Sequence, residues 1–82
     1  MAKIQKWSIE IGGEIHSVEY TPRKLFSKAK IKIDGKTYPI HSAKIFGGGQ
    51  EAFILGGERA VIQIGKGKRA TVWVDNEKIK EI

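Results

Sequence analysis

The sequence contains no cysteine, so disulfide bridges cannot stabilise the fold and thiolate metal sites are excluded. It has only two histidines, His16 and His41, whereas a zinc site needs three or four converging ligands. The longest unbroken apolar run is residues 52–55, too short for a membrane span or for the apolar region of a signal peptide. We therefore expect no metal, no membrane association and a cytoplasmic location.

The chain is short and basic. Its 82 residues suit one domain, which we predict over residues 1–82. A hydrophobic share of 40% and a charged share of 29% are typical of a folded globular protein. Fifteen lysines and arginines against nine acidic residues give a net charge of +6, which favours attraction to polyanions. Most of these cations are lysines, however, and lysines along strands also protect sheet edges from aggregation.

Apolar and polar residues alternate with a period of two through most of the chain, which predicts β-strands. Trp7, Ile9 and Ile11, for example, are separated by single polar residues. The predicted strands cover residues 6–11, 15–20, 29–34, 36–40, 52–55, 59–64, 69–75 and 78–81. No segment has convincing helical spacing, although residues 25–28 could form one helical turn or a loop.

Turn sequences separate these strands. Gly12-Gly13 and Asp34-Gly35 favour the positive φ angles of tight hairpin turns. Pro39 has no N–H group, so the strand that contains it should lie at a sheet edge or at a bulge. In segments 31–36 and 72–77, two apolar residues separated by one residue are followed by aspartate and a turn residue. We interpret this shared pattern as repeated use of one hairpin turn. Short strands with frequent turns predict an all-β domain of seven or eight antiparallel strands, either a small β-sandwich or a small β-barrel.

The alternation also predicts the core and argues against a catalytic site. None of the four serines lies in a nucleophile motif. His16 and Glu19, three residues apart on a strand, should point to opposite faces, so we interpret His16 as a partly buried strand residue. The residues therefore nominate no catalytic site, and a small hydrolase is left as the third and least favoured function. The predicted core residues are Trp7, Ile9, Ile11, Val18, Tyr20, Ile31, Ile33, Phe53, Ile62, Ile64, Val72 and Val74.

One surface is a candidate for binding. If Val72 and Val74 face inward, Trp73 faces outward near cationic residues, where it could stack on a nucleobase or pack against a protein partner. The segment 65–69 is most simply a charged hairpin turn, and its amides and cations could alternatively hold a phosphate. The residues of this possible interaction surface are Trp73, Arg69, Lys66, Lys68, Lys30 and Lys32.

The order of several short motifs resembles a known family. These motifs are Trp7-x-Ile-x-Ile, His16-x-Val-Glu-Tyr, Ile31-x-Ile-Asp-Gly-Lys, Phe46-x-x-Gly-x-Glu-x-Phe, Ala60-x-Ile-x-Ile and Val72-x-Val-Asp-Asn. Over residues 7–79 they resemble the β-domain of Fas apoptotic inhibitory molecule. The resemblance implies an antiparallel β-sandwich without catalytic activity or cofactor, in a cytosolic protein that acts through other proteins against cell death and aggregation. Members typically carry two such β-halves, whereas this chain has room for one.

Two functions follow as hypotheses. The first is a non-enzymatic protein-interaction domain that binds through an exposed strand edge or the Trp73 surface. The alternative is a basic domain that binds single-stranded nucleic acid or another polyanion through the cationic residues named above. The sequence leaves the partner and the oligomeric state open.

Overall fold

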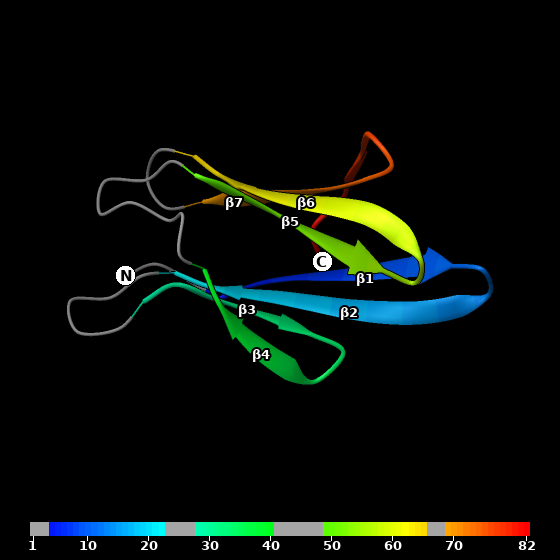
Figure 1. The fold of residues 1–82 in the computed structure, drawn as a ribbon, viewed down its shortest axis with the longest axis horizontal. Coiled ribbons are helices and arrows are strands. Elements are labelled where there is room, and N and C mark those ends of the chain that lie inside the picture. Colours follow the sequence, from blue (N-terminus) through cyan, green and yellow to red (C-terminus); the bar gives the residue numbers. More distant parts are fainter. Residues whose placement is uncertain (1–3, 23–27, 41–48, 66–68) are drawn as a thin grey trace.

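The computed structural model describes residues 4–22, 28–40, 49–65 and 69–82. These residues form two four-stranded antiparallel sheets, in the orders β1-β2-β3-β4 and β5-β6-β7-β8, which lie one above the other (Figure 1). No described residue is helical, and the described chain has no helix that could span a membrane. The strands are β1 (Gln5–Ile11), β2 (Glu14–Thr21), β3 (Lys30–Ile33), β4 (Lys36–Pro39), β5 (Gln50–Leu55), β6 (Glu58–Ile64), β7 (Ala70–Val74) and β8 (Glu77–Ile79).

The all-β prediction is confirmed, and the architecture is that of a small β-sandwich, since the two sheets do not close into a barrel. The eight strands match the predicted segments within about two residues at each end. Pro39 ends β4, an edge strand, as its missing N–H group predicts. The possible helical turn at 25–28 falls almost wholly outside the described residues.

Each sheet is a meander that uses the same two hairpin turns. The Gly-Gly turns at 12–13 and 56–57 have φ angles of 60° and 83° in the first sheet and 57° and 82° in the second. The turns at 34–35 and 75–76 each begin with an aspartate, at φ 48° and 49°. The interpretation of 31–36 and 72–77 as one repeated hairpin turn is therefore confirmed, and the two hairpins hold equivalent places in the two sheets.

The core lies between the sheets. Nine of the twelve predicted core residues are buried, among them Val18, Ile62 and Val72 with no exposed surface. Ile11, Ile33 and Phe53 are only partly buried but pack against the core, because the first two adjoin hairpin turns and the third lies on edge strand β5. The buried residues that were not predicted are Gln5, Pro22, Ala29, Ile40, Leu55, Ala60 and Ala70.

Gln5 links the two sheets along one side of the sandwich. Its side chain is 2% exposed, and Oε1 accepts a hydrogen bond of 2.7 Å from the Ala70 N–H group. Nε2 donates to the Ala70 carbonyl at 2.9 Å and to Glu81 Oε1 at 2.8 Å. The C-terminal residue closes the same side, since the Ile82 N–H group donates to the Lys6 carbonyl at 2.9 Å.

Candidate functional site

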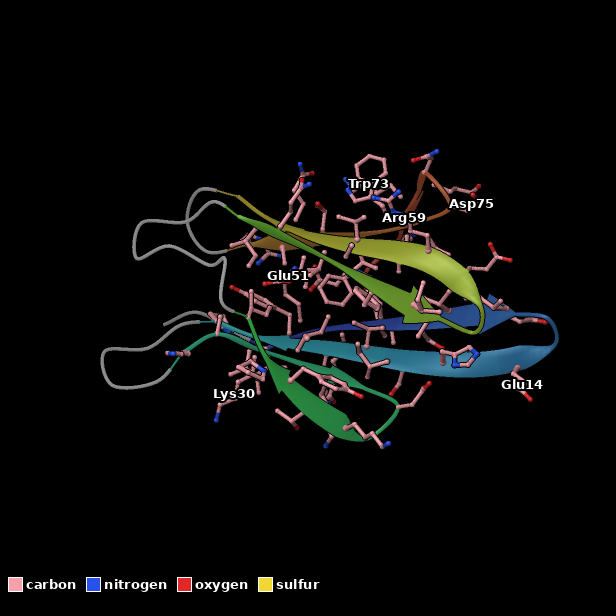
Figure 2. All side chains as sticks on the ribbon, in the orientation of Figure 1. Glu14, Lys30, Glu51, Arg59, Trp73 and Asp75 are labelled. Carbon is pink, nitrogen blue, oxygen red and sulfur yellow. The ribbon has the colours of Figure 1, made fainter. Side chains whose placement is uncertain are left out.

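The outer face of the second sheet has an apolar centre. Strand pairing places Ala52, Val61 and Trp73 side by side across β5, β6 and β7, with Lys78 of β8 at the end of the row. The neighbouring row contains Ile54, whose side chain is 69% exposed. The prediction that Trp73 faces outward is therefore confirmed, and Figure 2 shows its ring above the sheet.

Polar side chains surround this apolar centre. Trp73 is half-buried, and its Nε1 donates to Thr71 Oγ1 at 3.2 Å, which fixes the ring against the sheet. Arg59 is opposite Ile54, and Gln63 is opposite Thr71. We call the apolar residues Ala52, Ile54, Val61 and Trp73, together with this polar rim, the Trp73 face.

The central rows on the outer face of the first sheet are polar instead, and the exposed Ile15 lies near the hairpin turn. Lys6, Glu19 and Lys32 are neighbours in one row across β1, β2 and β3, and Lys6 Nζ lies 3.5 Å from Glu19 Oε1. Lys30 lies in the next row, between Thr21 and Pro39. Opposite charges that alternate across strands stabilise a solvated sheet face and offer little apolar area to a partner.

The residues of the predicted interaction surface do not converge. Trp73 lies on the outer face of the second sheet, whereas Lys30 and Lys32 lie on the outer face of the first sheet, on the far side of the sandwich (Figure 2). The Arg69 side chain is directed to the C-terminal segment, where Nη2 lies 3.1 Å from Glu81 Oε1. Lys66 and Lys68 fall outside the described residues. The described members therefore belong to separate surfaces, because alternation gives the face of a strand but not the sheet that carries it.

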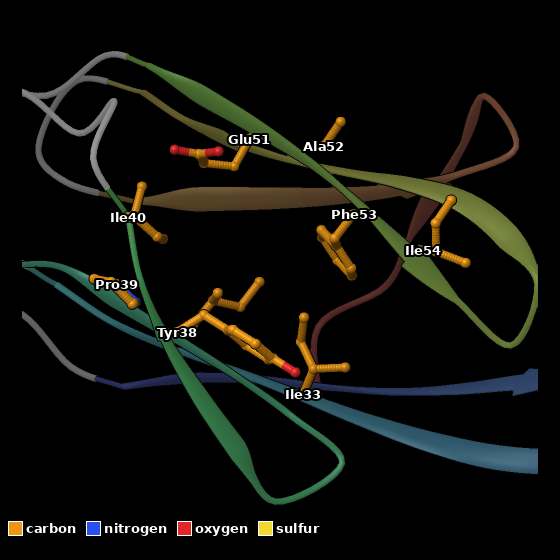
Figure 3. A pocket seen from close by; sticks show the side chains of 9 residues that line it. Ile33, Tyr38, Pro39, Ile40, Glu51, Ala52, Phe53 and Ile54 are labelled. Atoms are coloured by element: carbon orange, nitrogen blue, oxygen red, sulfur yellow. The ribbon is translucent and has the colours of Figure 1, made fainter.

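A groove opens along the side of the sandwich between β4 and β5. Its volume is about 310 Å³, and Ile33, Tyr38, Ile40 and Phe53 contribute apolar walls. Figure 3 shows Phe53 of β5 and Tyr38 of β4 directed into the space between the sheets. Ala52 and Ile54 also border the groove, so the groove is continuous with the Trp73 face around the edge of β5.

A histidine and an aspartate form a pair that the sequence did not predict. His16 Nδ1 donates to Asp34 Oδ2 at 2.7 Å, and the Ser17 N–H group donates to Asp34 Oδ1 at 2.9 Å. The hydrogen bond from His16, and then that from Ser17, lower the pKa of the Asp34 carboxyl. The prediction of a partly buried His16 is confirmed, since its side chain is 13% exposed.

The pair shows no arrangement for metal binding. His16 Nε2 is buried without a hydrogen-bond partner among the described residues, and Glu14 Oε2 lies 4.0 Å away. Within the described ranges, no group of three or more histidine, aspartate or glutamate residues could hold a metal ion. We interpret the His16 and Asp34 pair as a link between β2 and the turn that follows β3.

The comparison with protein families decides the assignment. The family model described as Fas apoptotic inhibitory molecule (FAIM1) matches residues 3–82, nearly the entire chain. The chain belongs to the FAIM1 family. The resemblance predicted from the short motifs is thereby confirmed. Searches of curated proteins and of solved structures find no match.

In this FAIM1 family domain, sequence reasoning identified Trp73 but missed its apolar neighbours. Ala52 and Ile54 lie on a segment without a polar alternation, so their outward direction could not be deduced. Only the pairing of β5 with β6 and of β6 with β7 places these side chains beside Trp73.

Proposed function

We propose that this FAIM1 family domain is a non-enzymatic protein-interaction domain that binds its partner through the Trp73 face. The observation that carries the proposal is the contrast between the two outer faces: one is apolar at its centre, whereas the central rows of the other are polar and its exposed Ile15 lies apart, next to the hairpin turn. An apolar centre with a polar rim is the usual anatomy of a protein interface. Tryptophan and arginine, both present on this face, are the residues enriched among those that dominate binding energy.

The family description gives this proposal a cellular context. It names the inhibition of Fas-dependent apoptosis, and a domain that acts against cell death or protein aggregation through partner binding would need such a face. We propose that this role is exercised in the cytoplasm, the location expected from the sequence.

Site-specific photo-cross-linking in cells tests the proposal. A benzoylphenylalanine in place of Gln63, which is exposed beside the apolar centre, should give cross-links to another protein. The same residue in place of Ser8, exposed on the outer face of the first sheet, is the matched control. A Trp73→Ser substitution should abolish the cross-links from position 63. Equal cross-linking from both positions, or no effect of Trp73→Ser in a folded domain, would overturn the proposal.

The alternative function is the binding of single-stranded nucleic acid or another polyanion. Its support is the net charge of +6 and the two exposed lysines, Lys30 and Lys32, on the outer face of the first sheet. Binding of a labelled oligonucleotide should then weaken steeply with salt and should be lost when both lysines are replaced by glutamate. Because Trp73 lies on the opposite face, Trp73→Ser should leave such binding unchanged. Binding that is insensitive to salt, or absent at low salt, would contradict this alternative.

A further inference from the structure

Three of the four sheet edges are protected from pairing with another strand. The edge of β1 meets the C-terminal segment, where the Ile82 N–H group donates to the Lys6 carbonyl. The edge of β4 is four residues long and contains Pro39, and that of β8 is three residues long and contains Lys78. Short edges, prolines and lysines are the devices that prevent edge-to-edge association.

The edge of β5 lacks these three devices, and its one charged residue, Glu51, lies on the side of the groove. The strand is six residues long, contains neither proline nor lysine, and ends in the apolar run Ala52 to Leu55. It stands at the end of its sheet, with no described strand paired beyond it. An edge of this kind is suited to strand addition.

The register of β5 shows which backbone groups face outward. The Ile64 N–H group donates to the Gly49 carbonyl at 2.9 Å, so Gly49 and every second residue after it bond to β6. Of the residues in between, Ala52 and Ile54, the two nearer the hairpin turn, therefore present their N–H and C=O groups to the outer edge of the strand. Their side chains lie on the Trp73 face.

A strand added at this edge would have apolar surface against both of its faces, with Glu51 as the one charged residue in the wall of the groove. One row of its side chains would enter the groove beside Phe53 and Tyr38, and the other row would lie beside Ile54 on the Trp73 face (Figure 3). If one face of the added strand were in water, the edge would favour a partner with alternating apolar and polar residues. Two apolar surfaces select a partner with consecutive apolar residues instead.

The charges near this edge indicate the ends of that partner. Arg59 is the exposed cross-strand neighbour of Ile54, and the exposed Lys36 pairs with Ile33 at the wall of the groove. Arg59 lies where β5 approaches its hairpin turn, and Lys36 is the cross-strand neighbour of a residue that lines the groove. A second copy of this chain is disfavoured as the occupant, because each copy carries a net charge of +6.

We propose that the free edge of β5 binds, by strand addition, an extended segment of another protein that has consecutive apolar residues and an acidic end. This inference rests on the proposed function and specifies the chemistry of its partner. The backbone groups of Ala52 and Ile54 hold the segment, the groove and the Trp73 face accept its side chains, and Arg59 and Lys36 attract its acidic end.

A synthetic peptide tests the proposal. The probe has a run of valine and phenylalanine flanked by glutamates and carries a fluorophore, and binding is followed by fluorescence anisotropy. We expect saturable binding that is at least about tenfold weaker for the same peptide with alternate backbone amides methylated, since each methyl group removes a hydrogen bond and also prevents close approach.

Variants of the protein locate the site. Ala52→Pro removes an outward N–H group and leaves the ladder between β5 and β6 intact, and it should weaken binding about tenfold or more. Ile54→Thr should also weaken binding while keeping a strand-forming residue. Ile15→Thr is the matched control, because Ile15 is 73% exposed on β2 of the other sheet and its replacement should have no effect.

The outcomes separate this inference from the proposed function. If the methylated peptide binds as well as the parent, or if Ile15→Thr weakens binding as much as Ile54→Thr, strand addition at β5 is wrong. If that occurs while the cross-links from position 63 persist, the proposed function stands without this inference. If sedimentation shows a dimer that Ala52→Pro dissociates, the occupant is a second copy, which overturns the proposed partner.

Discussion

Gly56, in the turn between β5 and β6, lies against His16 of β2, and a Cβ atom at position 56 would stand 2.8 Å from the imidazole Nε2. The same atom would lie 3.1 Å from Ile11 Cγ2. The hairpin of β5 and β6 therefore packs against the hairpin of β1 and β2 through Gly56, a residue that has no side chain. The contact joins two turns that are 44 residues apart, and it explains why a glycine is required at position 56 for packing as well as for its φ angle of 57°.

Gly56→Ala should therefore destabilise the domain more than Gly57→Ala. Both glycines have positive φ angles, 57° and 82°, so both variants carry the cost of about 1 kcal/mol or more for a left-handed alanine. Nothing lies within 4 Å of a Cβ at position 57, whereas position 56 meets His16 and Ile11. Overpacking of this kind adds about 1–3 kcal/mol. Equal free energies of unfolding in urea would contradict the contact.

The link formed by Gln5 gives a second prediction. Gln5→Leu removes both hydrogen bonds to Ala70 and leaves a buried N–H and a buried C=O group without their partner. Each unsatisfied group costs about 1–3 kcal/mol, so we expect a loss of several kcal/mol in the free energy of unfolding. Gln63→Leu makes the same change at an exposed position of β6 and should alter stability by less than about 0.5 kcal/mol. Similar losses in the two variants would show that Gln5 has no special role.

The sequence predicted the faces of strands better than the relations between them. Val18, Ile62 and Val72 are fully buried as their alternation predicts. Gln5 has the same phase as Trp7 and Ile9, but its amide argued for exposure, and only the backbone of β7 makes its burial favourable. The hydrogen bonds of Gln5, like the pair of His16 and Asp34, depend on the order of strands in space, which alternation does not encode.

The candidate site shows the same limit. The outward direction of Trp73 followed from its two valine neighbours, whereas Lys30 and Lys32 were assigned to its surface without knowledge of the sheet to which each strand belongs. The structure separates them because the first four strands and the last four form independent meanders. Ala52 and Ile54 gain their significance only from the position of β5 at the end of a sheet.

Asp34 should make stability fall in acid. Hydrogen bonds from His16 and Ser17 lower the pKa of the carboxyl in the folded chain, so its contribution is present above the unfolded pKa of about 3.9 and is lost as the pH falls through the lower folded pKa. Asp34→Asn should remove this part of the pH dependence, measured as the free energy of unfolding in urea between about pH 6 and 2. An unchanged acid dependence would show that the pair with His16 contributes nothing.

Asp75→Asn is the matched control for that measurement. Asp75 begins the equivalent turn at nearly the same φ angle, and its N–H group donates to the Arg59 carbonyl as that of Asp34 donates to the Ser17 carbonyl. When the two sheets are aligned on these two hydrogen bonds, Glu58 occupies the position that His16 has in the first sheet. Asp75→Asn therefore removes no hydrogen bond from an imidazole, and the variant should keep the acid dependence of the parent domain.

Tyr20 should make stability fall in alkali. Burial raises the pKa of its phenol above the usual value of about 10, since the charged phenolate is poorly solvated in the core. The contribution is complete below the unfolded pKa, and it is lost as the pH rises toward the higher folded pKa, because the unfolded chain loses its proton first. Tyr20→Phe should flatten this alkaline decline in unfolding free energy, whereas Tyr38→Phe, at a residue 46% exposed, should not. Identical declines in both variants would exclude Tyr20 as the cause.

Ile33 and Lys32, neighbours on β3, test the assignment of faces within the first sheet. Ile33 packs against the core opposite the fully buried Val18, so Ile33→Asp places a carboxylate at apolar surface and should unfold a domain of this size. Lys32 is exposed opposite Glu19, so Lys32→Asp should leave the domain folded and cost no more than about 1 kcal/mol from the like charge. Thermal unfolding followed by circular dichroism distinguishes the two variants. Equal tolerance of both would mean that β3 presents no buried face, and the sandwich described above would be wrong at that strand.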